Sequence, residues 1–215
     1  MNLTELRDSV RTQLQLDEVE LPNSAVDFYL RAAFDITVQA ERQWPFLEKQ
    51  WDLTTVAGVR AVAVPEDYRA HHGVYHQETG PLRELDHGFA IDNFGSIETA
   101  DGYPQWISRF GGFFYLWPNL EDAVHTLIVI GVRAPLAFPI NAADSPDCDR
   151  RLDIALVWYA CSLAKQQEED EVLAAEYKTL WQDALAAARA DIMRVDELRP
   201  RFLNSRPTSL SYWAP

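Results

Sequence analysis

The chain has 215 residues, of which 47% are hydrophobic and 24% are charged, and its formal net charge is −14. This is ordinary globular composition, and a chain of this length buries enough surface to fold without disulfides. Proteins that grip nucleic acid by its phosphates carry an excess of lysine and arginine, so the charge argues against tight binding to DNA or RNA.

The sequence also gives no sign of a membrane segment. The longest continuous apolar run, residues 127–132, is far shorter than the roughly 20 residues that a membrane-spanning helix needs. The first residues, Met-Asn-Leu-Thr-Glu, lack the basic and then apolar layout of a signal peptide. We therefore expect a protein that acts without secretion and without a membrane.

Two helices are predicted in the first 43 residues. Asn2 and Glu5 have the spacing of a capping box, and apolar residues at intervals of three and four predict a helix over about residues 3–15. Ser24 and Asp27 form a second capping signal, and helical spacing continues to about residue 43, before Pro45. We expect these two helices to form a hairpin.

The residues from about 50 to 134 alternate between apolar and polar, which predicts an inserted antiparallel sheet. Strands are expected at about 51–55, 59–64 and 71–77, whereas residues 83–94 fit either a short helix or an irregular loop. The segments 106–110 and 113–117 are separated by two glycines, which suit a two-residue hairpin turn. We expect these two strands to form a three-stranded meander with residues 124–132.

The segment GGFFYLWP, residues 111–118, is apolar on both faces of its predicted strand. Side chains alternate across a strand, so the two faces carry different aromatic side chains and both need cover, from this chain or from another. The candidate residues for a contact between subunits are Trp106, Phe110, Phe113, Phe114, Tyr115 and Trp117.

Two more helices are predicted at about residues 147–166 and 171–195, with an acidic joint between them. The buried stripe of the first is expected to contain Leu152, Ala155, Leu156, Tyr159 and Leu163. The two cysteines, Cys148 and Cys161, lie in or beside this apolar pattern, and we expect them to be buried thiols in a reducing compartment.

The last residues, DELRPRFLNSRPTSLSYWAP, have no regular period and read either as a frayed end or as a docking tail. Arginine and aromatic side chains are the usual anchors of protein interfaces. The candidate docking residues are Arg199, Arg201, Phe202, Arg206, Leu210, Tyr212 and Trp213.

Taken together, these patterns predict an α+β fold that is mainly an α-helical bundle of two helical hairpins, with an inserted antiparallel β-sheet module and an extended C-terminal tail. Residues 1–195 are expected to form a single domain, with helices at about 3–43 and 147–195 and the β insertion at about 50–134. Residues 196–215 are expected to form the tail.

Few residues have the pattern of a metal site. His71, His72 and His76 are the obvious candidates, with Asp67 and Glu78 nearby as oxygen donors. However, the surrounding residues favour a strand, in which His71 points away from the other two histidines. We expect no metal and no cofactor.

A catalytic arrangement is equally absent from the sequence. Ser96, Ser108 and Ser162 lack an elbow motif, and Cys161 lies in the middle of a predicted apolar helix. The paired glycines at 111–112 are not followed by the Lys-Ser/Thr of a phosphate loop, and the carboxylate pairs at 66–67 and 121–122 flank turns. We expect no enzymatic activity.

The order of these elements resembles the head-to-tail adaptor proteins of tailed bacteriophages, a group that includes tail tubular and head-completion proteins. The resemblance covers about residues 2–192. Arg31 and the tail beyond about residue 195 depart from the pattern. The segments that carry the resemblance are LTELRDSVRTQL, DLTTVAGVRAVAVPEDY, VYHQETGPLRELD, GYPQWISRFGGFFYLWPNLEDAVHTLIVIGVRAPLAF and DSPDCDRRLDIALVWYACSLAKQQEEDEVLAAEYKTLWQDAL.

This resemblance implies a structural virion protein of the neck, made in the cytoplasm of the host bacterium. Such proteins form a homo-oligomeric ring, usually of twelve subunits, which binds the portal protein and offers a platform to a tail, stopper or other neck protein. DNA passes through the channel of the ring without being tightly bound. The candidate acidic surface facing DNA consists of Glu168, Glu169, Asp170 and Glu171.

Two other functions stay open from the residues alone. One is a soluble protein-binding module that uses the apolar sheet for a different partner. The other is a small enzyme with a site among the three histidines and nearby carboxylates.

Overall fold

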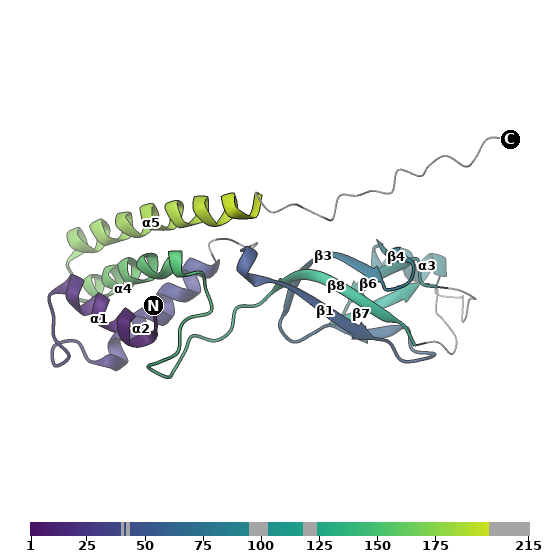
Figure 1. Ribbon diagram of the computed structural model, residues 1–215, viewed down its shortest axis with the longest axis horizontal. Coiled ribbons are helices and arrows are strands. Elements are labelled where there is room, and N and C mark those ends of the chain that lie inside the picture. The colour runs from purple at the N-terminus through teal and green to yellow at the C-terminus, as the bar shows by residue number, and fades with distance from the viewer. Residues whose placement is uncertain (40, 42–43, 95–102, 118–123, 198–215) are drawn as a thin grey trace. The chain divides into compact units, whose positions relative to one another are not determined.

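The structure is a computed structural model that describes residues 1–39, 41, 44–94, 103–117 and 124–197 (Figure 1). The contacts of the chain divide it into two compact units. Residues 1–40 and 138–215 make up the first, which we call the helical unit, and residues 41–137 make up the second, the sheet unit.

The helical unit begins with α1, Leu3–Leu14, and α2, Asn23–Gln39. The predicted capping box is confirmed, because the Asn2 side chain accepts from the Glu5 amide and the Glu5 side chain accepts from the Asn2 amide. The predicted cap at Ser24 is wrong, since α2 already starts one residue earlier. Asp27 instead accepts two hydrogen bonds from the guanidinium of Arg7, at 2.6 and 2.7 Å, which joins α2 to α1.

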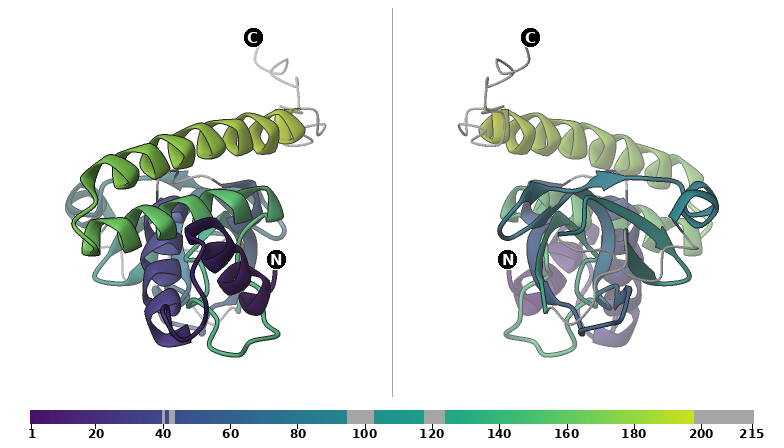
Figure 2. Two further views of the ribbon diagram at one scale, coloured as in Figure 1. Left: turned by 90° about the vertical axis from the view of Figure 1, so that its left-hand side faces the viewer. Right: turned by 90° about the vertical axis from the view of Figure 1, so that its right-hand side faces the viewer.

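The second helical pair consists of α4, Asp153–Gln167, which follows the short 3-10 helix η2, Arg150–Leu152, and α5, Glu171–Glu197. Packing of α4 against α1, α2 and α5 makes it the central helix of the unit (Figure 2, left). The single buried stripe that we predicted for this helix was therefore too narrow. Two residues of that stripe, Tyr159 and Leu163, are only half-buried. The buried residues of α4 are Asp153, Ala155, Leu156, Val157, Ala160, Cys161, Ser162 and Ala164.

The sheet unit begins with the 3-10 helix η1, Pro45–Leu47, and contains two four-stranded sheets. The first sheet has the order β1-β8-β3-β4 and the second the order β2-β7-β6-β5; all pairs are antiparallel except β5 with β6. The strands are β1 Glu48–Thr54, β2 Ala61–Ala63, β3 Tyr68–His76, β4 Gly80–Pro81, β5 Arg83–Glu84, β6 Trp106–Phe110, β7 Phe113–Trp117 and β8 Thr126–Arg133.

The predicted meander is wrong in one strand. β6 and β7 form the expected hairpin, but β8 lies in the other sheet, between β1 and β3. Leu127, Val129 and Val132 of β8 are all buried, and a strand with so much apolar surface is suited to a central position with partners on both edges.

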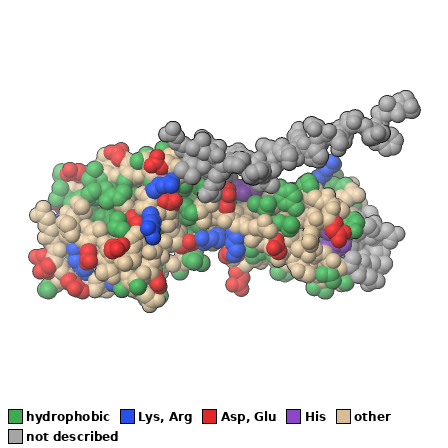
Figure 3. Space-filling view, in the orientation of Figure 1, with side chains coloured by type: hydrophobic (Ala, Val, Ile, Leu, Met, Phe, Trp, Pro, Cys, Tyr) green, Lys and Arg blue, Asp and Glu red, His purple; other side chains and the backbone are tan. Residues whose placement is uncertain are grey.

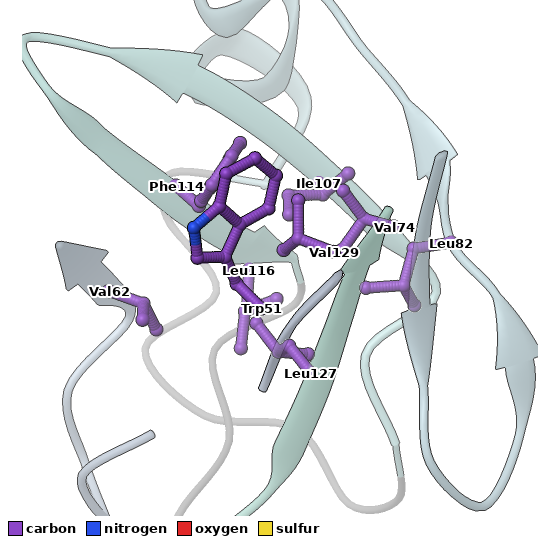
Figure 4. Close-up of a cluster of buried hydrophobic side chains, with 9 residues drawn as sticks. All are labelled: Trp51, Val62, Val74, Leu82, Ile107, Phe114, Leu116, Leu127 and Val129. Carbon is purple, nitrogen blue, oxygen red and sulfur yellow. The ribbon is translucent and has the colours of Figure 1, made fainter. Parts of the chain in front are cut away.

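A single hydrophobic core joins the two sheets face to face. Figure 4 shows its side chains pointing toward one another from strands of both sheets. The core residues are Trp51, Val62, Val74, Leu82, Ile107, Phe114, Leu116, Leu127 and Val129.

The predicted fold class was therefore wrong, because the protein is a mixed α+β structure and not mainly a helical bundle. The described residues hold five α-helices and two sheets, and the sheets have a core of their own. Residues 83–94, which fitted a helix or a loop, form β5 and then the remaining helix of the five, α3, which spans His87–Phe94. Among the described residues, every helix is too short or too polar to cross a lipid bilayer.

Candidate interaction surface

The second sheet has an outer side, opposite the shared core, that is rich in aromatic residues. In the β6–β7 hairpin, Ile107 and Leu116 pair across the strands and face the core. In each strand, the residues directly before and after these two point to the opposite side of the sheet. We call this outer side the aromatic face; its residues are Trp106, Ser108, Phe110, Phe113, Tyr115 and Trp117.

The two glycines of the hairpin set the position of its tip. Gly111 and Gly112 have φ values of 56° and 81°, in the left-handed region that a two-residue turn requires. This tight turn places Phe110 directly opposite Phe113. Two phenylalanines therefore lie at the end of the aromatic face.

Helix α3 covers part of the aromatic face. The His87 ring stacks parallel on Phe110, with centroids 4.8 Å apart, and lies 4.6 Å from the Tyr115 ring. About two helical turns further along, Phe94 stacks on Trp106 at 4.8 Å. These contacts fix α3 on the sheet through aromatic packing at both of its ends.

A polar group is buried beneath this layer. The Ser108 Oγ accepts a hydrogen bond of 2.7 Å from Trp117 Nε1 and lies 2.9 Å from His87 Nδ1. The Arg60 guanidinium sits over the Trp117 ring at 4.2 Å, and burial lowers the pKa of Arg60. Ser108 is only 1% exposed, so its hydroxyl orients aromatic side chains and is inaccessible to a substrate.

The candidate subunit-contact residues therefore divide into three groups. Phe114 and Trp117 are fully buried within the sheet unit, whereas Trp106 and Tyr115 are half-buried. Phe110 and Phe113 are 62% and 42% exposed. Among these six candidates, Phe110 and Phe113 at the tip of the hairpin are the ones that offer large apolar surface to another molecule.

A groove of about 750 Å³ runs along the end of β6 beside the start of α3. Leu85, Ile91 and Phe110 supply apolar lining, Glu84 and Asp86 supply carboxylates, and Arg109 supplies a guanidinium. The side chain of Ile91 is 49% exposed, and that of the neighbouring Phe89 is 54% exposed. The exposed tip of the aromatic face is thus continuous with an open groove that has acidic groups at its edge.

The three candidate metal ligands of β3 are not brought together. A β-bulge between His71 and Gly73 changes the alternation, so the His71 ring packs against Phe114 while His72 is exposed. His71 Nε2 lies 3.4 Å from a carboxylate oxygen of Glu84, and its Nδ1 contacts the Tyr68 hydroxyl. Among the described residues there is no group of three potential metal ligands.

The third histidine, His76, belongs to a buried pair with His125. The amides of Glu78 and Thr79 donate to His76 Nδ1, so its Nε2 carries the proton and donates to His125 Nδ1 at 2.9 Å. Burial, followed by the charge of His125, lowers the pKa of His76. The hydrogen bond between the two rings therefore ties the end of β3 to the residue that precedes β8.

The other candidate reactive groups have structural roles. Burial raises the pKa of the Cys148 and Cys161 thiols to about 12, which keeps both protonated and unreactive. The Ser162 hydroxyl donates to the Ala174 carbonyl at 2.9 Å, and Ser96 lies outside the described residues. Asp67 accepts from Lys49 and from Trp51 Nε1, and the Lys49 hydrogen bond contributes most to the lowered pKa of its carboxyl.

The acidic cluster at residues 168–171 forms the turn between α4 and α5. Lys165 donates to Glu168 at 2.6 Å, and Asp170 accepts from the Leu173 amide at the start of α5. Glu169 adopts a left-handed conformation with a φ of 61°, and Glu171 lies in the first turn of α5, where negative charge favours a helix. Hydrogen bonds and favourable charge at the ends of α4 and α5 therefore account for the presence of acidic residues in this turn.

The candidate docking tail lies outside the described residues. Its predicted docking residues were Arg199, Arg201, Phe202, Arg206, Leu210, Tyr212 and Trp213.

On the face shown in Figure 3, acidic side chains are scattered among basic and apolar ones over the described surface.

Several residues of the surface escaped sequence reasoning, chiefly His87, Arg60 and Phe94. One signal was available, because Asp86 precedes the helix and its side chain accepts from the Phe89 amide, as an N-cap residue does. The contacts of the His87 ring with β6 and β7 had no signal, since they depend on how α3 crosses the sheet.

The comparison with known families identifies the class of protein. The model of the SU10 adaptor protein family matches residues 1–204, so this chain belongs to that family of bacteriophage head-to-tail adaptor proteins. It is accordingly a structural component of a phage virion that associates with other head or tail proteins, and the family is not a class of enzymes. No curated protein matches the chain.

Proposed function

We propose that this protein forms a homo-oligomeric ring of about twelve subunits beneath the portal protein of the phage head. The ring extends the channel for DNA and provides the platform on which a tail, stopper or other neck protein assembles. The observation that carries this proposal is the family match over residues 1–204.

The exposed hairpin tip supports a contact between subunits. A ring requires a heterologous contact, in which one surface of a subunit meets a different surface of its neighbour. Phe110 and Phe113 are the exposed aromatic residues of the β6–β7 hairpin, and the sheet unit already has a complete core without them. Their exposure is therefore a cost that burial against a neighbour removes.

The overall charge supports passage of DNA without retention. With a net charge of −14, the protein repels phosphates over much of its surface at moderate salt. We propose that residues 168–171 belong to the surface facing DNA and that the C-terminal tail docks on the portal protein.

A variant pair tests the contact between subunits. Purified portal rings are mixed with the wild-type protein, with the double variant Phe110→Ser and Phe113→Ser, or with the control Phe28→Ser, whose phenyl ring in the helical unit is 69% exposed. We expect wild-type and Phe28→Ser proteins to form a complete collar on the portal, and the double variant to leave it incomplete. A complete collar from the double variant would exclude the hairpin tip as a ring contact.

Removal of the tail tests the portal contact separately. Deleting residues 198–215 is expected to weaken docking on the portal while far-UV circular dichroism and the unfolding temperature stay those of the full chain. Equal docking of the truncated and full chains would show that the tail does not bind the portal.

A further inference from the structure

The groove beside the hairpin tip has a chemistry that the ring proposal does not use. Its volume of about 750 Å³ lies within the usual size range of ligand-binding pockets. Its lining includes the apolar side chains of Ile91 and Phe110, the carboxylates of Glu84 and Asp86, and the guanidinium of Arg109. A complementary ligand therefore has both apolar and basic side chains.

The carboxylates of Glu84 and Asp86 differ in how many hydrogen-bond acceptors they leave open to a ligand. The Glu84 side chain is 61% exposed, and His71 approaches only one of its oxygens, at 3.4 Å. Asp86 Oδ1 accepts from the Phe89 amide at 3.1 Å and keeps further lone pairs for a donor.

Cations nearby do not neutralise these two carboxylates in the described structure. Arg109 itself lines the groove, but its guanidinium lies over the Tyr68 ring at 5.0 Å and donates to the Tyr68 hydroxyl at 3.4 Å. Arg83 lines a neighbouring hollow with Tyr103 and Trp106. The groove thus offers acidic acceptors next to an apolar floor.

The sequence of this chain contains a segment of matching composition. Residues 198–206, LRPRFLNSR, carry Arg199, Arg201 and Arg206, three large apolar residues and no acidic residue, in a protein whose net charge is −14. Pro200 and Pro207 disfavour helix at the residues before them, so the segment suits an extended conformation.

The position of the segment also matters. It follows directly on α5, which ends at Glu197, whereas the remaining residues 207–215 have no charged side chain and hold Leu210, Tyr212 and Trp213. The basic part and the aromatic part of the tail are therefore separate in sequence, which suits two different binding partners.

We propose that residues 198–206 of one subunit bind in the groove of a second copy, with arginines on Glu84 and Asp86 and Phe202 against Phe110. This contact deepens the proposed ring and rests on it for its biological setting. On this proposal the portal contact falls to residues 207–215, so deleting residues 207–215 alone should weaken docking on the portal and keep the contact between subunits. Charge-assisted hydrogen bonds from guanidinium to carboxylate supply the specificity, and the apolar floor supplies burial.

A peptide binding assay tests the recognition without requiring a ring or a portal. A fluorescein-labelled peptide of residues 198–207 is titrated with the full-length protein and followed by fluorescence anisotropy. For the double variant Glu84→Gln and Asp86→Asn, the Kd is expected to rise about tenfold, because charge-assisted hydrogen bonds are lost. Asn keeps the helix-capping ability of Asp86.

A matched control keeps the change in net charge equal. The double variant Glu176→Gln and Asp183→Asn alters two exposed carboxylates of α5 and is expected to bind the peptide as the wild type does. No binding at about 1 mM wild-type protein, or an equal Kd for both double variants, overturns the proposal.

Photocrosslinking identifies which copy supplies the tail. Full-length chains with p-benzoylphenylalanine in place of Phe202 are mixed in isotopically heavy and light forms and irradiated. We expect heavy–light adducts at residues 84–91 or 109–110. Adducts only within one isotope form, adducts elsewhere, or no adducts would contradict the proposal.

The proposed function and this inference fail separately. A collar that forms on the portal while the peptide does not bind leaves the ring intact and removes the groove contact. Peptide binding without a collar removes the portal function and keeps the recognition by the groove.

Discussion

At the scale of single residues, Gly131 shows how closely two strands of the first sheet approach one another. A Cβ atom on Gly131 would lie 2.1 Å from the Ala70 carbonyl oxygen and 2.6 Å from the His71 Cα. Both neighbours are backbone atoms at the bulge of β3, so a side chain cannot be accommodated by a rotamer change.

We therefore expect Gly131→Ala to lower the free energy of unfolding by about 1–3 kcal/mol or more, through overpacking. Gly73→Ala is the matched control, because its Cβ would meet only the Tyr75 side chain, at 3.1 Å and beyond. Urea unfolding measures both. A loss for Gly131→Ala no larger than that for Gly73→Ala would mean that the two strands separate easily.

The His76–His125 pair predicts a dependence of stability on pH. Burial lowers the pKa of His76 in the folded protein below its unfolded value of about 6.5. Folding therefore favours the neutral imidazole, and its contribution is complete above pH about 6.5 and is lost as the pH falls through the lower, folded pKa.

We expect the wild-type protein to lose more unfolding free energy between pH 7.5 and pH 5.5 than the variant His76→Gln. Urea titrations at the two pH values measure the difference. The same loss in both proteins would show that the pKa of His76 is the same in the folded and the unfolded chain.

At the scale of secondary-structure elements, the β7 strand has two faces with different energetic roles. Phe114 is 1% exposed in the shared core, and its neighbour Phe113 is 42% exposed on the aromatic face. The two residues are adjacent on one strand, so substitutions there compare the faces directly.

Phe114→Ala is expected to cost about 3–5 kcal/mol of unfolding free energy, since it leaves a cavity between the sheets. Phe113→Ala is expected to cost at most about 1 kcal/mol, as exposed substitutions usually do. Chemical denaturation followed by tryptophan fluorescence provides both values. Similar costs at the two positions would contradict the observed burial.

The elements that sequence reasoning predicted best are those specified by local signals. The Asn2–Glu5 capping box and the paired glycines at 111–112 act within a few residues, and both appear as expected. The position of β8 depends instead on pairing with β1 and β3, which are distant in sequence. Its alternating pattern predicts a strand but carries no information about which sheet receives it.

The same difference between local signals and long-range contacts applies to the exposure of residues on the aromatic face. His87 and Phe94 of α3 help to bury Trp117, whereas Phe110 stays 62% exposed although His87 stacks on it, and the residues of α3 fitted both a helix and a loop. The sequence therefore predicted which strands were aromatic, but the residues available to a partner depended on a tertiary contact.

At the scale of the whole molecule, charge predicts how the protein meets DNA. With a net charge of −14 it should not retain duplex DNA at physiological salt. We expect no shifted band in an electrophoretic mobility assay at 150 mM salt and about 10 μM protein. A stable complex under these conditions would exclude a channel surface that DNA passes freely.

The central claim is that copies of this chain complete their apolar surface against one another on a portal. The most direct measurement is electron cryomicroscopy of full-length protein mixed with the matching portal ring at micromolar concentration. The account predicts a closed collar on the portal, with the Phe110–Phe113 tip of each sheet unit buried against its neighbour. Portal rings without a collar, or a collar in which both phenyl rings face solvent, would contradict it.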